Sequence, residues 1–347
     1  MSPDLNSLSA YQFDLPPELI AQVPITPRDS SRLMVIDRST GNISEMVFRD
    51  LKDFLKSRDS LVFNDTKVIP ARIIGKRPTG GTAEIFLVRS LGNHIWEALA
   101  RPGKKMRAGS KVEFGNNFSC EILETLPNGN KIVRFDTGGE DFERQLDKFG
   151  QMPLPMYIKR EGKNEEDAER YQTIYAANPG ALAAPTAGLH FTEEMIKYMK
   201  NKGIDQSHIT LHVGLGTFRP VQVDDIRQHP MHSEQFLISP DTATRLNQRS
   251  ITHRQICVGT TSCRALETAS NVNGEIISGT YDTNIFIHPG YQFKYVKSLL
   301  TNFHIPGSTL LMLVCAFAGY DLTMEAYARA IKDRYRFYSY GDAMLIL

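Results

Sequence analysis

Side chains able to carry acid–base chemistry gather in those loops of this sequence that are rich in glycine and proline. They are His190, His212, His304 and Asp342, with His232 and Glu234 in one further loop. Histidine and carboxylates are the common agents of proton transfer, and loops at strand ends are where α/β sheets hold ligands. One loop histidine is more often structural than catalytic, but the number and placement of these residues together indicate an active site. No pair has the HExxH spacing of a zinc helix, so we expect no metal.

A second candidate is Thr260-Thr261-Ser262, which follows the apolar stretch 256–259 and opens a predicted helix. Backbone N–H groups and the helix dipole at such a start favour an anion, for example a carboxylate or a phosphate. An ordinary hydroxyl cap explains the same residues and is the commoner case. The sequence alone leaves both interpretations open.

The string Gly214-Leu-Gly-Thr-Phe-Arg219 begins like a dinucleotide-binding fingerprint and then departs from it. Arg219 stands where the third glycine belongs, and Pro220 interrupts any helix that would follow. The sequence also lacks a GxxxxGK[ST] string. We therefore reject a Rossmann site and a P-loop, and retain only a tight turn that brings the backbone close to a ligand.

Positive charge is concentrated in one segment of an otherwise balanced chain. Residues 67–107 carry nine basic side chains and two acidic ones, whereas the whole chain has a net charge of +1. Such patches bind phosphate backbones by releasing counterions. A solvated protein surface is the competing explanation. The residues that we expect to contact RNA are Lys67, Arg72, Lys76, Arg77, Arg101, Lys104 and Lys105.

Length and composition limit the classes of protein in which these candidate residues can occur. The 347 residues suggest about two domains, and 41% apolar with 23% charged residues is enough for a packed core. The longest apolar stretch, 309–318, is about half a membrane span, and the N-terminus lacks the pattern of a secretory signal. Four cysteines without CxxC spacing predict neither a disulfide framework nor a cysteine metal site. We expect a soluble enzyme of a reducing compartment.

The pattern of elements predicts an α/β fold, with a large mixed α/β domain that carries a small inserted antiparallel β-barrel. Between residues 71 and 150, five or six short alternating strands are separated by glycine-containing turns, and a helix is expected over 141–149. Residues 1–70 and 151–347 alternate strands and helices, as a mainly parallel sheet requires. Helices are predicted from 192 to 203 and from 308 to 318, and 161–170 is predicted to be a loop.

Several long strings resemble one known family. They are Phe63-Asn-Asp-Thr-Lys-Val-Ile-Pro-Ala-Arg72, Tyr171-Gln-Thr-Ile-Tyr175, Ala184-Pro-Thr-Ala-Gly-Leu-His-Phe191, Leu211-His-Val-Gly-Leu-Gly-Thr-Phe-Arg-Pro-Val221, Thr260-Thr-Ser-Cys-Arg-Ala-Leu-Glu267, Thr301-Asn-Phe-His-Ile-Pro-Gly-Ser-Thr-Leu310 and Tyr335-Arg-Phe-Tyr-Ser-Tyr-Gly-Asp-Ala-Met344. The family is the S-adenosylmethionine:tRNA ribosyltransferase-isomerase of queuosine biosynthesis. The resemblance covers the chain from about residue 11 onward. Departures at Met156, Cys263 and Gly307 affect no group that we regard as chemical.

The resemblance implies a reaction. The family transfers and isomerises the ribosyl moiety of S-adenosylmethionine onto 7-aminomethyl-7-deazaguanine at the wobble position of tRNA. It gives epoxyqueuosine and releases adenine and methionine. S-adenosylmethionine is thus consumed as a co-substrate, with no recycled cofactor. The expected partners are this donor and the precursor tRNA, for a monomer in the cytoplasm.

Roles within that reaction are assigned as hypotheses. His190, His212 and Asp342 are the candidates for proton transfer, with His304 next. Asp65 would orient ribose or a base edge. Arg264 and the Thr260–Ser262 helix start would hold the methionine carboxylate. Phe218 and Tyr340 would face the sulfonium, with Arg219 in the same donor site.

Two other classes of protein compete with this interpretation. A non-catalytic RNA-binding protein would explain the basic segment but has no need of the polar loops. An S-adenosylmethionine methyltransferase would use the same donor, but the strand–GxGxxG element and the radical-type CxxxCxxC are both missing from the sequence.

Overall fold

The large lobe of the molecule is built on a nine-stranded mixed sheet. The computed structural model describes residues 3–115, 117–160, 165–214, 216 and 221–347. In spatial order the strands are β16 (Gly279–Thr283), β14 (Glu234–Ile238), β13 (Asp205–Leu211), β3 (Asp59–Asn64), β15 (Arg254–Val258), β17 (Ser298–Asn302), β18 (Ala343–Ile346), β1 (Arg32–Asp37) and β2 (Asn42–Val47). The four central strands β13, β3, β15 and β17 run parallel, and β18 and β1 run parallel to each other but opposite to β17.

Helices cover both faces of this sheet, because its buried strands are apolar on both sides. In β1, Met34 and Ile36 enter one core, and Leu33 and Val35 enter the other. The first core is covered by α5 (Pro240–Thr252), α6 (Thr260–Ala269), α7 (Thr309–Ala318) and α8 (Tyr320–Lys332). The second core is covered by α1 (Leu51–Phe54), α4 (Glu193–Asn201) and the short helix η6 (Thr186–His190).

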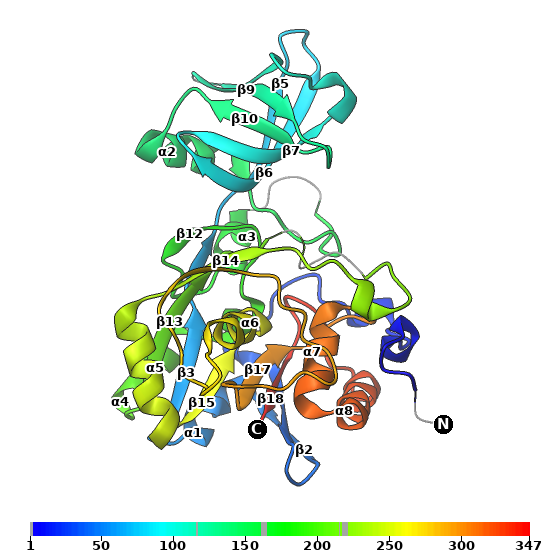
Figure 1. Ribbon diagram of the computed structural model, residues 1–347, viewed down its shortest axis with the longest axis vertical. Coiled ribbons are helices and arrows are strands. Elements are labelled where there is room, and N and C mark those ends of the chain that lie inside the picture. The colour runs from blue at the N-terminus through cyan, green and yellow to red at the C-terminus, as the bar shows by residue number, and fades with distance from the viewer. Residues whose placement is uncertain (1–2, 116, 161–164, 215, 217–220) are drawn as a thin grey trace.

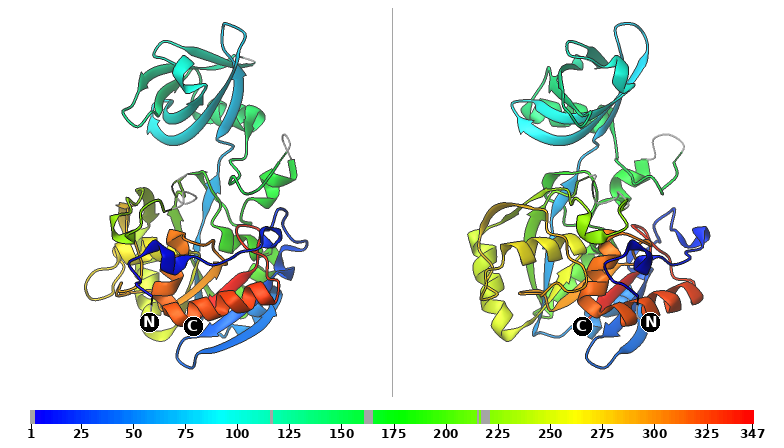
Figure 2. Two further views of the ribbon diagram at one scale, coloured as in Figure 1. Left: turned by 90° about the vertical axis from the view of Figure 1, so that its right-hand side faces the viewer. Right: turned by 45° about the vertical axis from the view of Figure 1, so that its right-hand side comes forward.

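The second lobe is a closed antiparallel barrel. Its strands are β5 (Arg72–Lys76), β6 (Thr82–Gly92), β7 (Ile95–Arg101), β8 (Lys111–Gly115), β9 (Phe118–Thr125) and β10 (Lys131–Phe135). Pairing of β5 with β8 closes the barrel, and β11 (Gly150–Gln151) adds to β5. The helix α2 (Gly139–Phe149) inserts Phe142 and Leu146 into the barrel core. The barrel stands at one end of the molecule, and both chain termini lie in the large lobe (Figures 1 and 2).

Two linkers connect the lobes. On the way out, β3 leads into β4 (Thr66–Val68) and then into the barrel. On the way back, the chain passes α3 (Glu165–Arg170) and then β12 (Asn178–Ala181), which pairs with β4. Short helices complete the chain: η1 (Leu8–Tyr11), η2 (Pro17–Leu19), η3 (Arg28–Ser30), η4 (Phe48–Asp50), η5 (Gly103–Lys105) and η8 (Ile226–Gln228).

Most of the expected elements are confirmed, and one is wrong. The predicted helices at 141–149, 192–203 and 308–318 are α2, α4 and α7. Residues 165–170 were expected in a loop but form α3, which is held by ion pairs instead of an apolar face. One of these joins Arg160 to Asp167 at 2.7 Å. The rest of that loop, 161–164, lies outside the described residues.

None of the described helices is by itself long and apolar enough to cross a membrane. Taken together, α7 and α8 have the length and composition of a membrane span, but they are bent by 117° relative to each other.

Candidate functional site

The polar loops meet at one edge of the large sheet. Parallel strands place their carboxyl ends at the same edge. Here β3, β13, β15 and β17 end there, and β18 and β1, which run the other way, begin there. Loops from distant parts of the sequence therefore converge. Since β3 leads directly toward the barrel, this edge faces the second lobe (Figure 1).

A pocket opens at this edge, and we call it the edge pocket. It measures about 790 Å³ out to its open mouth, which is in the range of small-molecule sites. Its walls come from the ends of β15 and β17, η6, the start of α7 and the loop before β18. The lining residues are Tyr157, Ala183–Ala187, Val213, Gly259–Thr261, Thr301–Ile305, Ser308, Leu310, Tyr338 and Ser339.

One wall of the edge pocket is the start of α6. Gly259 precedes the helix with a φ of 93°, a left-handed conformation that favours glycine and turns the chain sharply from β15 into α6. The Thr261 hydroxyl is buried and has no hydrogen-bond partner among the described residues. The Ser262 hydroxyl instead donates to the carbonyl of Val258 at 2.8 Å. This helix start therefore presents to the pocket backbone donors and one unpaired hydroxyl.

His190 lies behind this pocket in a fixed hydrogen-bond chain. Asn302 Nδ2 donates to the Tyr338 carbonyl at 3.0 Å and to His190 Nε2 at 3.3 Å. Because an amide nitrogen only donates, Nε2 accepts, and the ring proton lies on Nδ1 and is donated to Ser31 Oγ at 2.7 Å. Burial lowers the pKa of His190 to about 3. The Asn302 Oδ1 atom, in the wall of the edge pocket, has no partner among the described residues.

His304 lies in the pocket wall itself. Its Nε2 is 2.9 Å from Thr301 Oγ1, and its backbone N–H donates to the Tyr327 hydroxyl at 3.0 Å. Burial lowers its pKa to about 3. Among the four expected proton-transfer residues, His304 is the one that lines the edge pocket.

Asp342 is engaged by the backbone. Its Oδ1 accepts from the Arg32 N–H and its Oδ2 from the Arg336 N–H, both at 2.8 Å. The side chain is 2% exposed, and burial raises its pKa despite these bonds. The carboxylate thus joins the start of β1 to the loop before β18, which suits a positioning residue.

His212 and Asp65 form a separate cluster at the ends of β13 and β3. His212 Nδ1 is 2.8 Å from Thr66 Oγ1. Asp65 Oδ1 accepts from Thr210 Oγ1 at 2.6 Å and from Asn178 Nδ2 at 2.9 Å. Burial lowers the pKa of His212, although Asp65 acts in the opposite direction. Neither side chain lines the edge pocket, which the neighbouring Val213 reaches.

The remaining expected donor contacts divide between two other places. Tyr340 lies in a small pocket with His190, Arg28 and Arg170, and its hydroxyl donates to Asp167 at 3.4 Å. Arg264 lines a pocket adjoining the edge pocket. Phe218 and Arg219 lie outside the described residues.

The basic residues lie around the barrel and the cleft beneath it. Lys67, Arg72 and Arg101 line a cleft of about 2030 Å³ between the lobes, opposite the apolar segment 152–156. Lys104 and Lys105 are exposed on η5, and Lys76 is exposed on β5. Glu84 pairs with Arg72 at 2.8 Å. Arg77 is half-buried.

Sequence reasoning missed Asn302, Ser31 and Ser339. Asn302 is the last residue of a buried strand and immediately precedes the Phe-His pair, so a polar amide at a strand end was the available signal. Ser31 gave no signal, because its link to His190 spans 159 positions of sequence. Among the described residues, no three His, Cys, Asp or Glu side chains lie close enough to hold a metal ion.

Comparison with known proteins gives one consistent result. Residues 8–346 match the model of a family described as queuosine biosynthesis protein. The chain is 50% identical over 339 residues to the S-adenosylmethionine:tRNA ribosyltransferase-isomerase of Clostridioides difficile, covering 97% of this chain and 98% of that one. It is 50% identical over 343 residues to the protein of the same name from Symbiobacterium thermophilum, covering 98% and 99% of the two chains. The crystal structure of S-adenosylmethionine tRNA ribosyltransferase from Thermotoga maritima has 36% identity and a TM-score of 0.55, covering 97% of this chain and 100% of that chain.

Proposed function

The chain belongs to the queuosine biosynthesis family of S-adenosylmethionine:tRNA ribosyltransferase-isomerases, and on this premise we propose that the edge pocket is where it consumes its donor. The enzyme transfers and isomerises the ribosyl moiety of S-adenosylmethionine onto tRNA. The acceptor that we propose is the aminomethyl group of 7-aminomethyl-7-deazaguanine at the wobble position. The products are then epoxyqueuosine in tRNA, adenine and methionine.

The observation that carries this proposal is a pair of buried polar atoms, on two residues that line the pocket, for which the described residues provide no hydrogen-bond partner. Thr261 Oγ1 offers a hydroxyl, and Asn302 Oδ1 offers an acceptor; the parent side chains are 7% and 1% exposed. A buried polar atom without a partner costs about 1–3 kcal/mol, so a ligand that supplies the partner recovers this cost. An adenine base presents both an amine donor and ring-nitrogen acceptors, which match these two atoms.

The reaction needs a group that accepts a proton from the carbon next to the positive sulfur. Removal of that proton gives an ylide, from which adenine is expelled; the tRNA amine then attacks, methionine leaves and the epoxide closes. We propose His304 as the first candidate for this proton transfer, because it lines the pocket and is neutral at pH 7. His190 Nε2 already accepts from Asn302, which favours a positioning role for His190.

The departing adenine carries away the electron pair of its bond to the sugar. Backbone N–H groups at the start of a helix, together with the helix dipole, stabilise negative charge. We propose that Thr260, Thr261 and the Ser262 backbone serve the adenine in this way. Tyr340 lines another cavity, and Asp65 and His212 lie in a cluster of their own. We assign these three residues to the approach of the RNA and to support of the pocket.

The RNA is proposed to enter between the lobes. The edge pocket faces the barrel, and the cleft beneath the barrel carries Lys67, Arg72 and Arg101. Anticodon-loop bases are single-stranded and can be splayed out into such a cleft, while Lys76, Arg77, Lys104 and Lys105 contact phosphates farther along. We propose a monomer that acts where tRNA is found, in the cytoplasm.

The test is adenine release from S-adenosylmethionine in the presence of precursor tRNA. We expect wild-type protein to release adenine and methionine in equal amounts, with ribosyl label moving to the RNA. His304→Ala should lower turnover by about 10²–10⁴-fold, the usual contribution of a proton-transfer group. His94→Ala, at an exposed barrel position, is the matched control. Intact donor after prolonged incubation would favour a non-catalytic RNA-binding protein, and methyl label on the RNA would favour a methyltransferase.

A further inference from the structure

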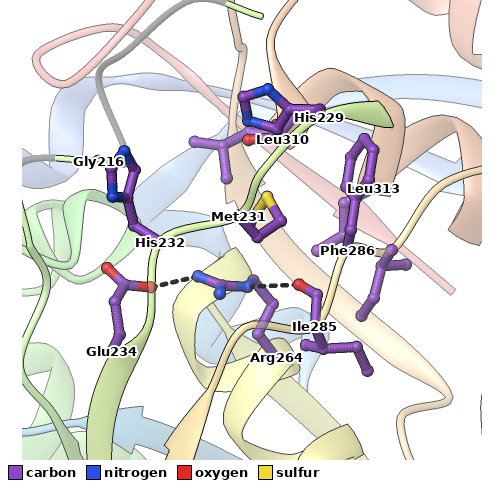
Figure 3. A pocket seen from close by; sticks show the side chains of 12 residues that line it. Gly216, His229, Met231, His232, Glu234, Arg264, Ile285, Phe286, Leu310 and Leu313 are labelled. Carbon is purple, nitrogen blue, oxygen red and sulfur yellow. Dashed lines mark hydrogen bonds and ion pairs between the residues drawn. The ribbon is translucent and has the colours of Figure 1, made fainter. Parts of the chain in front are cut away.

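A second, smaller pocket adjoins the edge pocket, and Arg264 forms its base (Figure 3). Leu310, in the first turn of α7, lines both cavities. The second pocket measures about 450 Å³ out to its mouth. The two cavities therefore adjoin at Leu310.

The Arg264 guanidinium is buried with one of its donors unused. Its Nη1 donates to Glu234 Oε2, and its Nε donates to the Ile285 carbonyl at 3.2 Å. Its Nη2 is buried and has no hydrogen-bond partner among the described residues, although the residue is 5% exposed. Two of its nitrogens are thus fixed by protein, and the third is held in place for a ligand acceptor. A carboxylate oxygen is the acceptor that arginine binds best.

Glu234 holds the guanidinium in this orientation. It is 6% exposed, and its Oε1 accepts from the Gly214 N–H at 3.0 Å. The pair places a positive and a negative group side by side. An amino acid carries an α-carboxylate and an α-ammonium, so the pair offers each of them a group of opposite charge. The assignment of the carboxylate depends on Arg264 alone.

The other walls of this compartment are apolar. Met231, Phe286, Leu310 and Leu313 surround the space above the ion pair (Figure 3). Such a lining suits the two methylene groups and the sulfur of a methionyl chain. Gly216 closes one side, where a Cβ atom would lie 2.4 Å from the His232 ring, so a larger residue would displace that ring.

We propose that this second compartment binds the methionyl end of the donor, with the α-carboxylate on Arg264 Nη2, while the nucleoside occupies the edge pocket. The sulfonium then lies near Leu310, where the two compartments meet. This inference rests on the proposed function. It also decides between two anion sites, Arg264 and the α6 start, in favour of Arg264 for the carboxylate.

The test compares S-adenosylmethionine with its decarboxylated analogue as donors for adenine release. Wild-type protein should prefer the carboxylated donor by at least tenfold in kcat/KM. Arg264→Met should lose this preference because the KM for S-adenosylmethionine rises at least tenfold, while kcat/KM for the decarboxylated donor stays within about twofold. Thr261→Val is the matched control: it should weaken both donors equally. Loss of the preference in Thr261→Val but not in Arg264→Met would overturn the inference.

Product inhibition provides an independent test of where the methionyl end of the donor binds. Free methionine should inhibit wild-type protein and fail to inhibit Arg264→Met, whereas free adenine should inhibit both. Because Arg264→Met removes the positive charge beside the buried Glu234 carboxylate, the double variant Arg264→Met/Glu234→Gln provides a form in which that negative charge is removed as well. If neither variant folds, the wild-type comparison decides, since equal use of the two donors would overturn the assignment. Absence of adenine release from any donor by wild-type protein would instead refute the proposed function itself.

Discussion

At the scale of single residues, the side chains around the edge pocket fall into two groups. Asp342 and His190 have their polar atoms engaged by neighbours within the protein. Thr261, Asn302 and Arg264 each keep one buried polar atom that has no partner within the part of the chain that the structure describes. A group with all its bonds made inside the protein positions others, whereas a group with a bond left to make is prepared for a ligand. This distinction moves Asp342 from the proton-transfer candidates toward a supporting role.

Asp342→Asn should destabilise the fold, because an amide nitrogen cannot accept from a backbone N–H. Two charge-assisted bonds are affected, and we expect the free energy of unfolding to fall by about 2–4 kcal/mol. Urea unfolding measures this change. Asp14→Asn, at an exposed position, should alter it by less than about 0.5 kcal/mol. Unchanged stability with abolished adenine release would return Asp342 to a direct role in proton transfer.

His304→Gln should make stability less dependent on pH between 7 and 5. The pKa of His304 is lowered to about 3 by burial, whereas an exposed histidine titrates near 6.5. The unfolded chain therefore binds the proton first, and stability is lost as the pH falls from about 6.5 toward about 3. One such histidine accounts for about 2 kcal/mol between pH 7 and pH 5, and the variant should lack that loss. Urea unfolding at the two pH values measures it, with His94→Gln as the control; an equal loss in both variants would contradict the prediction.

The sequence predicted the residue types at the site better than their roles. His304, Thr260 and Thr261, which line the edge pocket, were singled out in the sequence because each lies shortly after a predicted buried segment; their roles stay predictions. The orphaned atoms of Asn302 and Arg264 were not predictable, since they depend on which bonds neighbouring segments have already made. Likewise, the sequence shows Asp342 in a glycine-containing loop, where a catalytic base could lie. Its bonds to two backbone N–H groups, which suggest a supporting role, are visible only in the structure.

At the scale of elements, α6 supports the site from both ends. Its first turn forms the pocket wall, and its Glu267 holds the segment that leads into β17. The two Glu267 oxygens accept from the backbone N–H groups of 294–296 at 2.8–3.0 Å and from the Tyr291 hydroxyl at 3.0 Å. Because β17 carries Asn302, this clasp fixes two walls of the pocket relative to each other.

Glu267→Gln should therefore loosen the segment before β17. The introduced amide nitrogen faces donors, and we expect a loss of roughly 2–4 kcal/mol in the free energy of unfolding. Hydrogen exchange of the 294–296 amides should accelerate as well. The control is Glu275→Gln, an exposed position in the same region, which should change stability by less than about 0.5 kcal/mol. Equal stability of the two variants would show that the clasp is not needed.

Elements with strong local signals were predictable, and those defined by pairing were not. In α4 the cap is present as expected, with Thr192 Oγ1 accepting from the Met195 N–H at 3.2 Å. The barrel strands alternate buried and exposed residues, so their period of two was visible in the sequence. The edge strand β2 is largely exposed and gave no apolar pattern. The helix α3 has four acidic or basic residues in its last five, Glu166 to Arg170, and resembles a loop by composition.

At the scale of the whole molecule, we propose that the barrel holds the RNA against the sheet edge at which the edge pocket opens. It is joined to the large lobe by the linkers on either side of the interlobe cleft, and it carries the exposed lysines of η5. Charge on the barrel therefore should control binding of tRNA without entering the chemistry. Proton transfer and RNA affinity are expected to be separable by mutation.

Charge reversal of Lys104 and Lys105 tests this separation. The double variant to Glu should weaken binding of precursor tRNA, and the slope of log affinity against log salt should decrease in magnitude by roughly 1.4–1.8, since each lost phosphate contact contributes about 0.7–0.9. Lys197 and Lys200, exposed on α4 in the large lobe, provide a control pair with the same change in net charge. Filter binding over a salt series measures the slope. An unchanged slope, or an equal change in the control, would refute this placement of the RNA.

We propose that residues 71–150 are a folding unit of their own. The barrel core is nearly self-contained: from outside those bounds it takes Ile69, two residues before them, and Leu182, which follows β12 on the returning linker. Expressed with the flanking residues 69, 70 and 151, this segment should unfold cooperatively in urea. A broad, non-cooperative transition would show that the barrel depends on the large lobe.

The position of β18 has a consequence for how the protein is made on the ribosome. This strand, the last of those described in sequence, lies in the interior of the sheet, with β17 on one side and β1 on the other. Until β18 has been synthesised, the β1–β2 hairpin has no bridge to the other strands, and the sheet edge that carries the edge pocket is incomplete. The barrel, whose strands are contiguous in sequence, can form earlier, since its last strand is made roughly 10–40 s before residue 343 at about 5–20 residues per second. Nascent chains stalled before residue 343 should therefore contain a finished barrel on an unfinished large lobe, with two bare strand edges for chaperones to shield.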